Sequence, residues 1–352
     1  MKGKPSGRTG RDFVLSFLGN IPQPRLLPMP WREEQVVFAD VGARGGPPAT
    51  WLRLSDRIRY ICFEPDPIEA QALRDYFSKH SPAQISVIEA ALGSQSGTGR
   101  LFLTKYRPSS SLLRPNHDFL NQLSVGNGFM IEEETQVNLT TLDQVLLAHK
   151  ERCDFLKIDV QGYELEVLRG GIRSIHHAIG CELEVSFVEI YQNQPLFAEI
   201  DQWMRAKGFF LADLERFWWH RRRMPRPWQE RGTLAYGNAF YLKRDALQPT
   251  EPRTAFRATI ICLGLGLDEL AFELVLESEK RGWISRQAKL DFSAWIQVHR
   301  RSSAFWFRIG NAFSLLPGKR TLGRWLGLWS RALHGNSDTG SDADSWNRRT
   351  SW

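Results

Sequence analysis

The sequence has few cysteines, and they form no pattern. Cys62, Cys153, Cys181 and Cys262 are far apart and include no C-x-x-C pair, so neither a disulfide framework nor a cysteine-based metal site is expected. The first three stand in or beside apolar runs, where cysteine usually acts as a small buried hydrophobe. This usage is typical of a reduced, cytoplasmic protein, and no metal is indicated.

A long hydrophobic stretch is also missing. The longest apolar run, "ATIICLGLGL", stops at Asp268 and has about half the length that a membrane span needs. The apolar piece "FVLSFLGNI" near the start is short and lacks a small-residue cleavage site, so no secretory signal is expected. The sequence therefore predicts a cytoplasmic protein, with association at a membrane surface left open.

Acidic residues are absent from residues 292–337, although the chain holds 39 of them against 46 lysines and arginines. The same stretch carries seven basic side chains, equal to the formal net charge of +7, interleaved with Trp and Phe. A helical cap packed on the rest of the chain is the favoured interpretation. Peripheral membrane contact through 292–334 is the second, because basic helices with aromatics on one side are typical of interfacial binders. Docking on nucleic acid is the third.

The rest of the composition is that of a globular protein, with 352 residues and 42% hydrophobic content, enough for about two domains. From residue 36, strand-like and helix-like segments alternate five times. The last two strand-like segments, "FFLADLERF" and "NAFYLKRD", have no helical pattern between them. This order predicts an α/β fold, a Rossmann-like, doubly wound parallel sheet that ends in an antiparallel hairpin and binds ligands at the carboxyl ends of its strands.

Changes in pattern divide the chain into four regions. Residues 1–35 are expected to form an N-terminal arm, and residues 36–245 the α/β domain. Residues 252–334 are expected to form a small all-helical region, and the polar residues 335–352 a disordered tail.

A dinucleotide fingerprint is missing too. The first glycine turn, in "VVFADVGARGGPP", does not follow G-x-G-x-x-G, and Pro47 and Pro48 remove amides that a phosphate would use. Asp40 precedes Gly42 and would repel a pyrophosphate, but it suits a ligand with an amino group. Glu64 ends the next strand, where an acid can accept hydrogen bonds from a ribose diol. This arrangement fits S-adenosylmethionine; a structural glycine turn in another α/β fold is the alternative.

Several segments in fixed order carry a resemblance: "DVGARGG", "FEPDP", "AALGS", "SSSLL", "TLDQVL", "FLKIDVQGYELEVLRGG" and "EVSFVEIYQNQPLFAEID". Over about residues 36–245 the chain resembles the FkbM-type methyltransferases, with the "KIDVQGYE" block as the most specific part. The resemblance implies a Rossmann-like class I methyltransferase fold that uses S-adenosylmethionine, commonly on hydroxyl groups of sugars or polyketides. Arg44 departs from the Asn more often found in the first turn. The cofactor-binding residues expected on this basis are Asp40, Gly42, Ala43, Gly46, Glu64, Pro65, Ala90 and Ala91.

Methyl transfer to a hydroxyl needs an aligned acceptor and benefits from a general base. Asp159, at the end of the fourth strand, is the first choice for that base. Glu184 on the fifth strand points away from the side of Leu183 by period-2 counting, and could lie near Asp159 so that the pKa of one carboxyl rises. The structural alternative is that Asp159 orients a loop and Glu184 pairs with an arginine. His117 is a weaker candidate for the base, and Glu164 is expected to cap a helix.

The acceptor side is expected to include two loops. One contains Ser110 and Ser111 of "SSSLL". The other is the aromatic and basic hairpin tip "ERFWWHRRRMPRPWQER", whose Trp218, Trp219 and Trp228 could stack on sugar rings and whose Arg221 could hold an anionic group. A solvated basic loop with one Trp folded back onto the core is the alternative.

Together these features predict an S-adenosylmethionine-dependent O-methyltransferase for a hydroxyl of a sugar, glycan-like or lipid-linked acceptor. Two alternatives remain. One is an RNA methyltransferase, which is supported only by the Arg/Trp loop. The other is a catalytically inactive module of the same fold that binds a glycan or a membrane.

Overall fold

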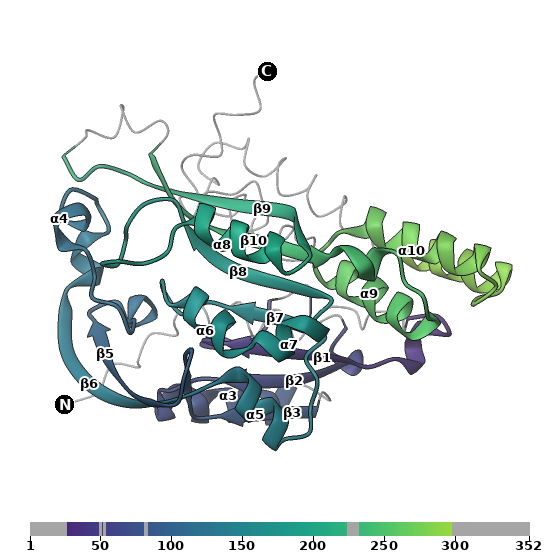
Figure 1. Ribbon diagram of the computed structural model, residues 1–352, viewed down its shortest axis with the longest axis horizontal. Coiled ribbons are helices and arrows are strands. Elements are labelled where there is room, and N and C mark those ends of the chain that lie inside the picture. The colour runs from purple at the N-terminus through teal and green to yellow at the C-terminus, as the bar shows by residue number, and fades with distance from the viewer. Residues whose placement is uncertain (1–26, 49–50, 52–53, 81–83, 224–231, 298–352) are drawn as a thin grey trace, which may run out of the picture.

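A seven-stranded sheet forms the centre of the molecule (Figure 1). The computed structural model describes residues 27–297 except 49–50, 52–53, 81–83 and 224–231. The strand order is β3-β2-β1-β7-β8-β10-β9; β10 pairs antiparallel with both β8 and β9, and the other pairs in this sheet are parallel. The predicted Rossmann-like sheet with a terminal antiparallel hairpin is therefore confirmed. Its strands are β1 (Val36–Val41), β2 (Ile58–Phe63), β3 (Gln84–Ile88), β7 (Phe155–Ile158), β8 (Gly180–Ser186), β9 (Phe209–Trp219) and β10 (Thr233–Lys243).

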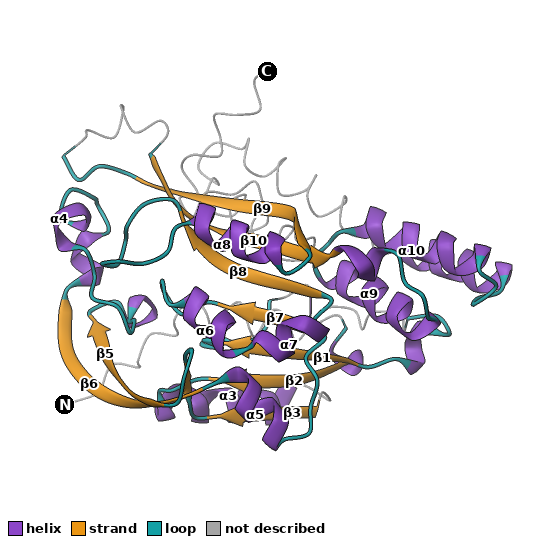
Figure 2. Cartoon of the chain, in the orientation of Figure 1, coloured by secondary structure: helices purple, strands orange, loops and turns teal. Residues whose placement is uncertain are grey.

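Helices cover both faces of this sheet, as Figure 2 shows. One face packs on α3 (Pro67–His80), and the other on α5 (Leu142–Ala148), α6 (Glu164–Gly170), α7 (Ile172–His177) and α8 (Phe197–Ala206). Helices α6 and α7 are separated at Gly171, because the pair Gly170-Gly171 weakens a helix interior.

A second, three-stranded sheet lies beside the first, with the order β4-β6-β5. Its strands are β4 (Ala91–Leu92), β5 (Gly97–Thr104) and β6 (Ile131–Thr140). The alternation of segments in the sequence does not mark β6 as a strand. β6 begins Ile-Glu-Glu-Glu and has no buried residue, so its sequence lacks the apolar residues by which a strand is recognised.

The helical C-terminal region starts inside the core. Helices α9 (Pro252–Gly264) and α10 (Asp268–Lys280) lie at the opposite end of the molecule from α4 (His117–Leu120), which belongs to the segment between β5 and β6 (Figure 1). Ile260 and Ile261 of α9 are fully buried in one cluster with Phe38 and Phe155 of the sheet. Trp31, from the expected arm, is buried in the same cluster and its ring contacts that of Phe256. Packing therefore ties α9 and residues 27–34 to the α/β domain.

The predictions for the two ends of the chain concern residues that lie mostly outside the described part of the structure. Residues 1–26, the tail 335–352 and nearly all of the basic stretch 292–337 lie outside the described residues. Within the part that is described, no helix combines the length and apolar character required to cross a membrane.

Candidate active site

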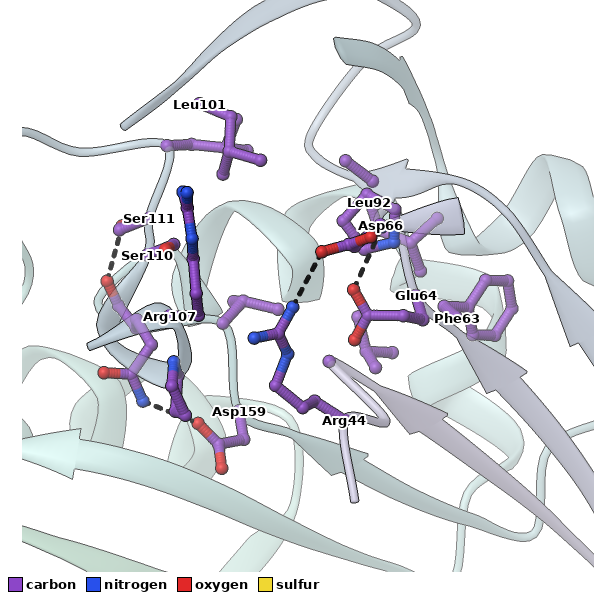
Figure 3. A pocket seen from close by; sticks show the side chains of 18 of the residues that line it. Arg44, Phe63, Glu64, Asp66, Leu92, Leu101, Arg107, Ser110, Ser111 and Asp159 are labelled. Atoms are coloured by element: carbon purple, nitrogen blue, oxygen red, sulfur yellow. Dashed lines mark hydrogen bonds and ion pairs between the residues drawn. The ribbon is translucent and has the colours of Figure 1, made fainter. Parts of the chain in front are cut away.

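A cavity of about 440 Å³ opens at the carboxyl ends of β1, β2 and β7. This volume lies in the range of pockets for small molecules, about 300–1,000 Å³. The small sheet and the loop after β5 close its other side (Figure 3). The expected cofactor and acceptor residues on its wall are Gly42, Glu64, Pro65, Ala90, Ala91, Ser110, Ser111 and Asp159.

Gly42 allows the first turn to lie against the end of β7. Its φ is +78°, and a Cβ at this position would lie 2.0 Å from the carbonyl oxygen of Asp159. Its amide donates to the carbonyl of Phe63 at 3.0 Å, which fixes the turn to β2 as well. The turn thus joins the three strand ends that frame the cavity. Ala43 and Gly46 belong to the same turn but do not line the cavity.

Glu64 contributes a buried carboxyl group to the cavity wall. Burial raises its pKa to about 7, although the Asp66 amide, which donates to Oε1 at 3.0 Å, and the nearby Arg44 act in the opposite direction. Arg44 extends from the first turn and binds Asp66 at 3.0 Å, so its guanidinium stands between Glu64 and Asp159 (Figure 3). The place where a ribose acid is predicted is therefore occupied by a carboxyl close to its titration point at neutral pH.

Asp40 lies beneath the cavity and does not form part of its wall. It is completely buried, accepts a hydrogen bond from the Tyr60 hydroxyl at 2.9 Å, and lies 3.3 Å from Nζ of Lys157. Burial raises its pKa, while Lys157 and then Tyr60 oppose the change. This geometry favours Asp40 as a support for the strand ends. A contact of Asp40 with the cofactor's amino group remains a prediction.

Asp159 and Glu184 are brought together by a third side chain. The amide nitrogen of Gln161 lies 2.8 Å from Oδ1 of Asp159 and 3.0 Å from Oε1 of Glu184. Burial raises the pKa of Glu184 well above its ordinary value, and repulsion from Asp159 and Glu164 adds to the effect. Asp159 lines the cavity and its side chain is 37% exposed, whereas Glu184 does not line the cavity. Asp159 is thus the carboxylate that an acceptor can reach.

Three polar residues near this pair were missed by sequence reasoning. Lys157 lies 3.9 Å from Asp159, and Gln161 lines the cavity. The Tyr191 hydroxyl lies 2.9 Å from the side-chain oxygen of Gln161. Lys157 and Gln161 stand in the "KIDVQGYE" block, so the block itself was the available signal. Tyr191 lies 30 positions after Gln161, in the segment "EVSFVEIYQNQPLFAEID", so that segment was the available signal for it.

Glu164 and His117 do not line the cavity. Glu164 accepts hydrogen bonds from the amides of Val160 and Gly162 at 3.0 and 3.1 Å, and burial raises its pKa to about 7. Glu164 therefore holds the loop before α6 rather than the helix amides, and its expected capping of the helix stays a prediction. His117 begins the short helix α4 (His117–Leu120), and its buried Nδ1 has no partner among the described residues.

The serine hydroxyls on the acceptor side make internal hydrogen bonds. Ser110 accepts from the amide of Thr104 at 3.1 Å, and Ser111 donates to the carbonyl of Gln161 at 2.7 Å. Both residues line the cavity, so they shape its wall while their hydroxyls hold the loop.

The aromatic hairpin residues lie away from the cavity wall. The Trp219 ring packs against Phe129 at 5.5 Å between ring centres, and Trp218 lies beside Arg216. Arg221 donates to Gln122 at 2.6 Å. Trp219 thus behaves as the alternative expects, folded onto a small cluster. Trp228 lies outside the described residues, and stacking of an acceptor on the hairpin remains a prediction.

No metal centre is evident in this part of the chain: the described residues contain no group of three or more His, Cys, Asp or Glu placed to hold an ion.

Comparison with known proteins gives one family match. Residues 40–211 match the family described as the Methyltransferase FkbM domain. A characterised relative, the 2-O-methyltransferase NoeI of Sinorhizobium fredii (strain NBRC 101917 / NGR234), is 27% identical over 175 residues, which is 47% of this chain and 70% of NoeI.

Solved structures show weaker likeness. The magnesium protoporphyrin IX methyltransferase ChlM of Synechocystis PCC 6803, with bound SAM, is 12% identical and covers 66% of this chain and 78% of its own, with a TM-score of 0.31. TrmK of M. capricolum, in complex with S-adenosyl-homocysteine, is 9% identical and covers 91% and 95%, also with a TM-score of 0.31. Likeness at these scores gives no information about the reaction or its acceptor.

Proposed function

We propose a reaction for this chain, which belongs to the FkbM methyltransferase family through residues 40–211. It transfers a methyl group from S-adenosylmethionine to a hydroxyl of a sugar or glycan-like acceptor. Membership makes it an S-adenosylmethionine-dependent methyltransferase. The sugar-type acceptor is supported by the relative NoeI, a 2-O-methyltransferase.

The cavity wall suits this methyl donor. Glu64 can accept hydrogen bonds from a ribose diol, and Pro65, Ala90 and Ala91 supply apolar surface beside it. Pro47 and Pro48 follow the first turn and carry no amide hydrogens for a phosphate. A positively charged, phosphate-free adenosine compound therefore fits better than a dinucleotide.

One observation carries the proposed reaction: Asp159 is an accessible carboxylate on the same cavity as Glu64. S-adenosylmethionine, when bound, supplies an electrophilic methyl group on a sulfonium. As the acceptor oxygen took up the methyl group, with the electron pair of the carbon–sulfur bond left on sulfur, Asp159 would accept the hydroxyl proton. Asp159 thereby acts as the general base, a role that contributes about 10²–10⁴-fold to a rate.

Identification of the product tests the proposal. Full-length protein is incubated with methyl-labelled S-adenosylmethionine and, separately, with a panel of mono- and oligosaccharides and with RNA. Label in an O-methyl group of a sugar, located by NMR, is the expected result. Label in RNA alone would replace the sugar acceptor with a nucleic acid. Binding of S-adenosylmethionine without transfer to any hydroxyl would favour an inactive module.

A further inference from the structure

We propose that Gln161 is a positioning residue for this reaction, whose side-chain amide holds Asp159 and Glu184 as one pair and presents Asp159 to the acceptor. The inference rests on the proposed function for the identity of the base. The inference goes beyond the proposed function because it gives a role to the neutral side chain of Gln161 and to the carboxyl group of Glu184, which does not line the cavity.

The first argument is the way in which the amide is used. A carboxamide has two N–H donors, and the nitrogen of Gln161 lies within hydrogen-bond distance of one oxygen from each carboxyl group, at 2.8 Å for Asp159 and 3.0 Å for Glu184. The amide oxygen lies 2.9 Å from the Tyr191 hydroxyl, whose single hydrogen is shared between this oxygen and the Ser109 carbonyl at 2.8 Å. The two carboxyl groups set the amide's orientation, because a flipped amide would turn its oxygen toward them.

The second argument is the backbone. Gln161 has a φ of +59°, a left-handed conformation that a residue with a side chain keeps only where its surroundings hold it. The Ser111 hydroxyl donates to the Gln161 carbonyl at 2.7 Å. Tyr191 is buried and its hydroxyl also lies 2.8 Å from the carbonyl of Ser109. The acceptor-side loop and the loop after β8 therefore aim the Gln161 amide together.

The third argument is the charge around the pair. Lys157 is the cation nearest Asp159, at 3.9 Å, and it also serves Asp40 at 3.3 Å. Burial and the neighbouring carboxylates raise the pKa of Glu184, so Glu184 holds its proton more readily than an ordinary glutamate. Asp159 is the member of the pair that lines the cavity, where an acceptor can reach it. The titratable groups that face the pair are Asp40, Lys157, Glu164, Glu182 and Tyr191.

The test removes the donors and leaves the backbone alone. Gln161→Met keeps an unbranched side chain of the same length, so the conformational demand at φ +59° is unchanged while both N–H donors disappear. Tyr191→Phe removes only the hydroxyl that contacts the amide oxygen. Gln287→Met is the matched control, because Gln287 is exposed and donates to Asp291 at 2.9 Å in the helix 286–297.

The first readout needs no acceptor. Infrared pH titration of full-length protein follows the band of the protonated carboxyl group. The band is assigned to Glu184 by its loss in Glu184→Gln. Hydrogen bonds to an ionised carboxylate lower its pKa, so Gln161→Met should move the midpoint of the pair upward by about one pH unit. Tyr191→Phe should move it in the same direction by less, and Gln287→Met should not move it.

The second readout is the pH dependence of kcat on the sugar acceptor. Gln161→Met should shift its acid limb to higher pH and lower kcat at neutral pH by about 10-fold or more, with the KM for S-adenosylmethionine nearly unchanged. An unmoved infrared midpoint in Gln161→Met, or in Tyr191→Phe if the first variant does not fold, would overturn the inference. So would a fall in kcat with an unmoved acid limb.

The two proposals fail separately. A shifted midpoint in a protein that methylates no sugar would contradict the proposed function and leave the pairing intact. Sugar methylation with an unmoved midpoint would do the reverse.

Discussion

At the scale of single residues, the tightest packing in the site is at Gly42. A Cβ there would lie 2.0 Å from a backbone carbonyl of the strand that carries Asp159, and the φ of +78° already disfavours a side chain. The first turn and the base are thus held at a fixed separation by the lack of one methyl group.

Gly42→Ala should destabilise the protein and misplace Asp159. We expect a loss of more than about 3 kcal/mol in unfolding free energy, from steric overlap added to a conformational penalty of about 1–2 kcal/mol. Gly208→Ala is the control, because Gly208 has a φ of +87° and nothing within 4 Å of its would-be Cβ. Denaturant unfolding of both variants measures the difference. Equal losses would show that overlap with Asp159 is unimportant.

Glu64 gives the cofactor site a dependence on pH. Its pKa is raised to about 7 by burial, and only the ionised form can accept both hydrogen bonds from a diol. Affinity for S-adenosylmethionine should therefore be full above pH 7 and fall as the pH drops through 7, by up to about tenfold per unit. Calorimetric titration between pH 6 and 8 checks this. Glu64→Gln should weaken binding of S-adenosylmethionine and make the affinity independent of pH in this range. Glu89→Gln, at an exposed site, is the control and should change neither property. If the affinity of Glu64→Gln still fell with pH, a group other than Glu64 would be responsible.

Part of this residue-level picture could be predicted and part could not. Asp159 and Glu64 were found because each ends an apolar strand, and period-2 counting placed Glu184 opposite Leu183. Gln161 was missed because its role depends on a left-handed backbone and on Tyr191, which only the fold brings near. Asp40 was expected on the cavity wall because the pattern did not show that Lys157 and Tyr60 take up its oxygens.

At the scale of elements, buried strands were predictable and exposed ones were not. Residues of β1 and β2 are apolar on both faces of the sheet, and β7 and β8 are apolar on at least one face, which gives each strand a hydrophobic signal. β6 is held mainly by eight residue pairs with β5 and by exposed ion pairs such as Arg114–Glu134, so its sequence is mostly polar.

Helix α9 is attached to the sheet by a charged contact as well as by its apolar face. Arg257 lies 3.3 Å from Glu34 and 3.1 Å from Asp154, whose other carboxyl oxygen accepts from the amide of Val37 in β1. Asp154 is only 6% exposed, so the guanidinium of Arg257 is needed to compensate the charge of its carboxylate.

Arg257→Met should therefore be costly. Removing one partner of a buried pair leaves an uncompensated carboxyl, and we expect a loss of about 3 kcal/mol in unfolding free energy. Arg253, one turn earlier, contacts the same Glu34 at 3.2 Å but is 68% exposed, so Arg253→Met should lose less than about 1 kcal/mol. Similar losses in the two variants, measured by denaturant unfolding, would contradict a special role for Asp154.

At the scale of the whole molecule, the start of the helical region and the α/β domain share one core. Ile261 of α9 lies in the cluster that also contains Trp31, Phe38 and Phe155. The change from alternating to helical pattern near residue 252 marked a difference in secondary structure, and periodicity alone could not show that α9 closes one face of the sheet.

Ile261→Ala tests whether this core unfolds as one unit. A large-to-small change at a fully buried site should cost about 2–5 kcal/mol and shift a single, cooperative transition. Tryptophan fluorescence and far-UV circular dichroism should report the same midpoint during thermal unfolding. Two separate transitions, with only one of them shifted, would show that α9 belongs to an independent domain.

The account as a whole depends on Asp159 taking the proton of the acceptor hydroxyl. The most direct measurement is turnover of Asp159→Asn in the sugar assay, together with its Kd for S-adenosylmethionine and with Asp118→Asn, at an exposed site on α4, as the control. We predict that kcat falls by about 10²–10⁴-fold while cofactor affinity and the control stay near wild type. Unchanged turnover in Asp159→Asn would contradict the account.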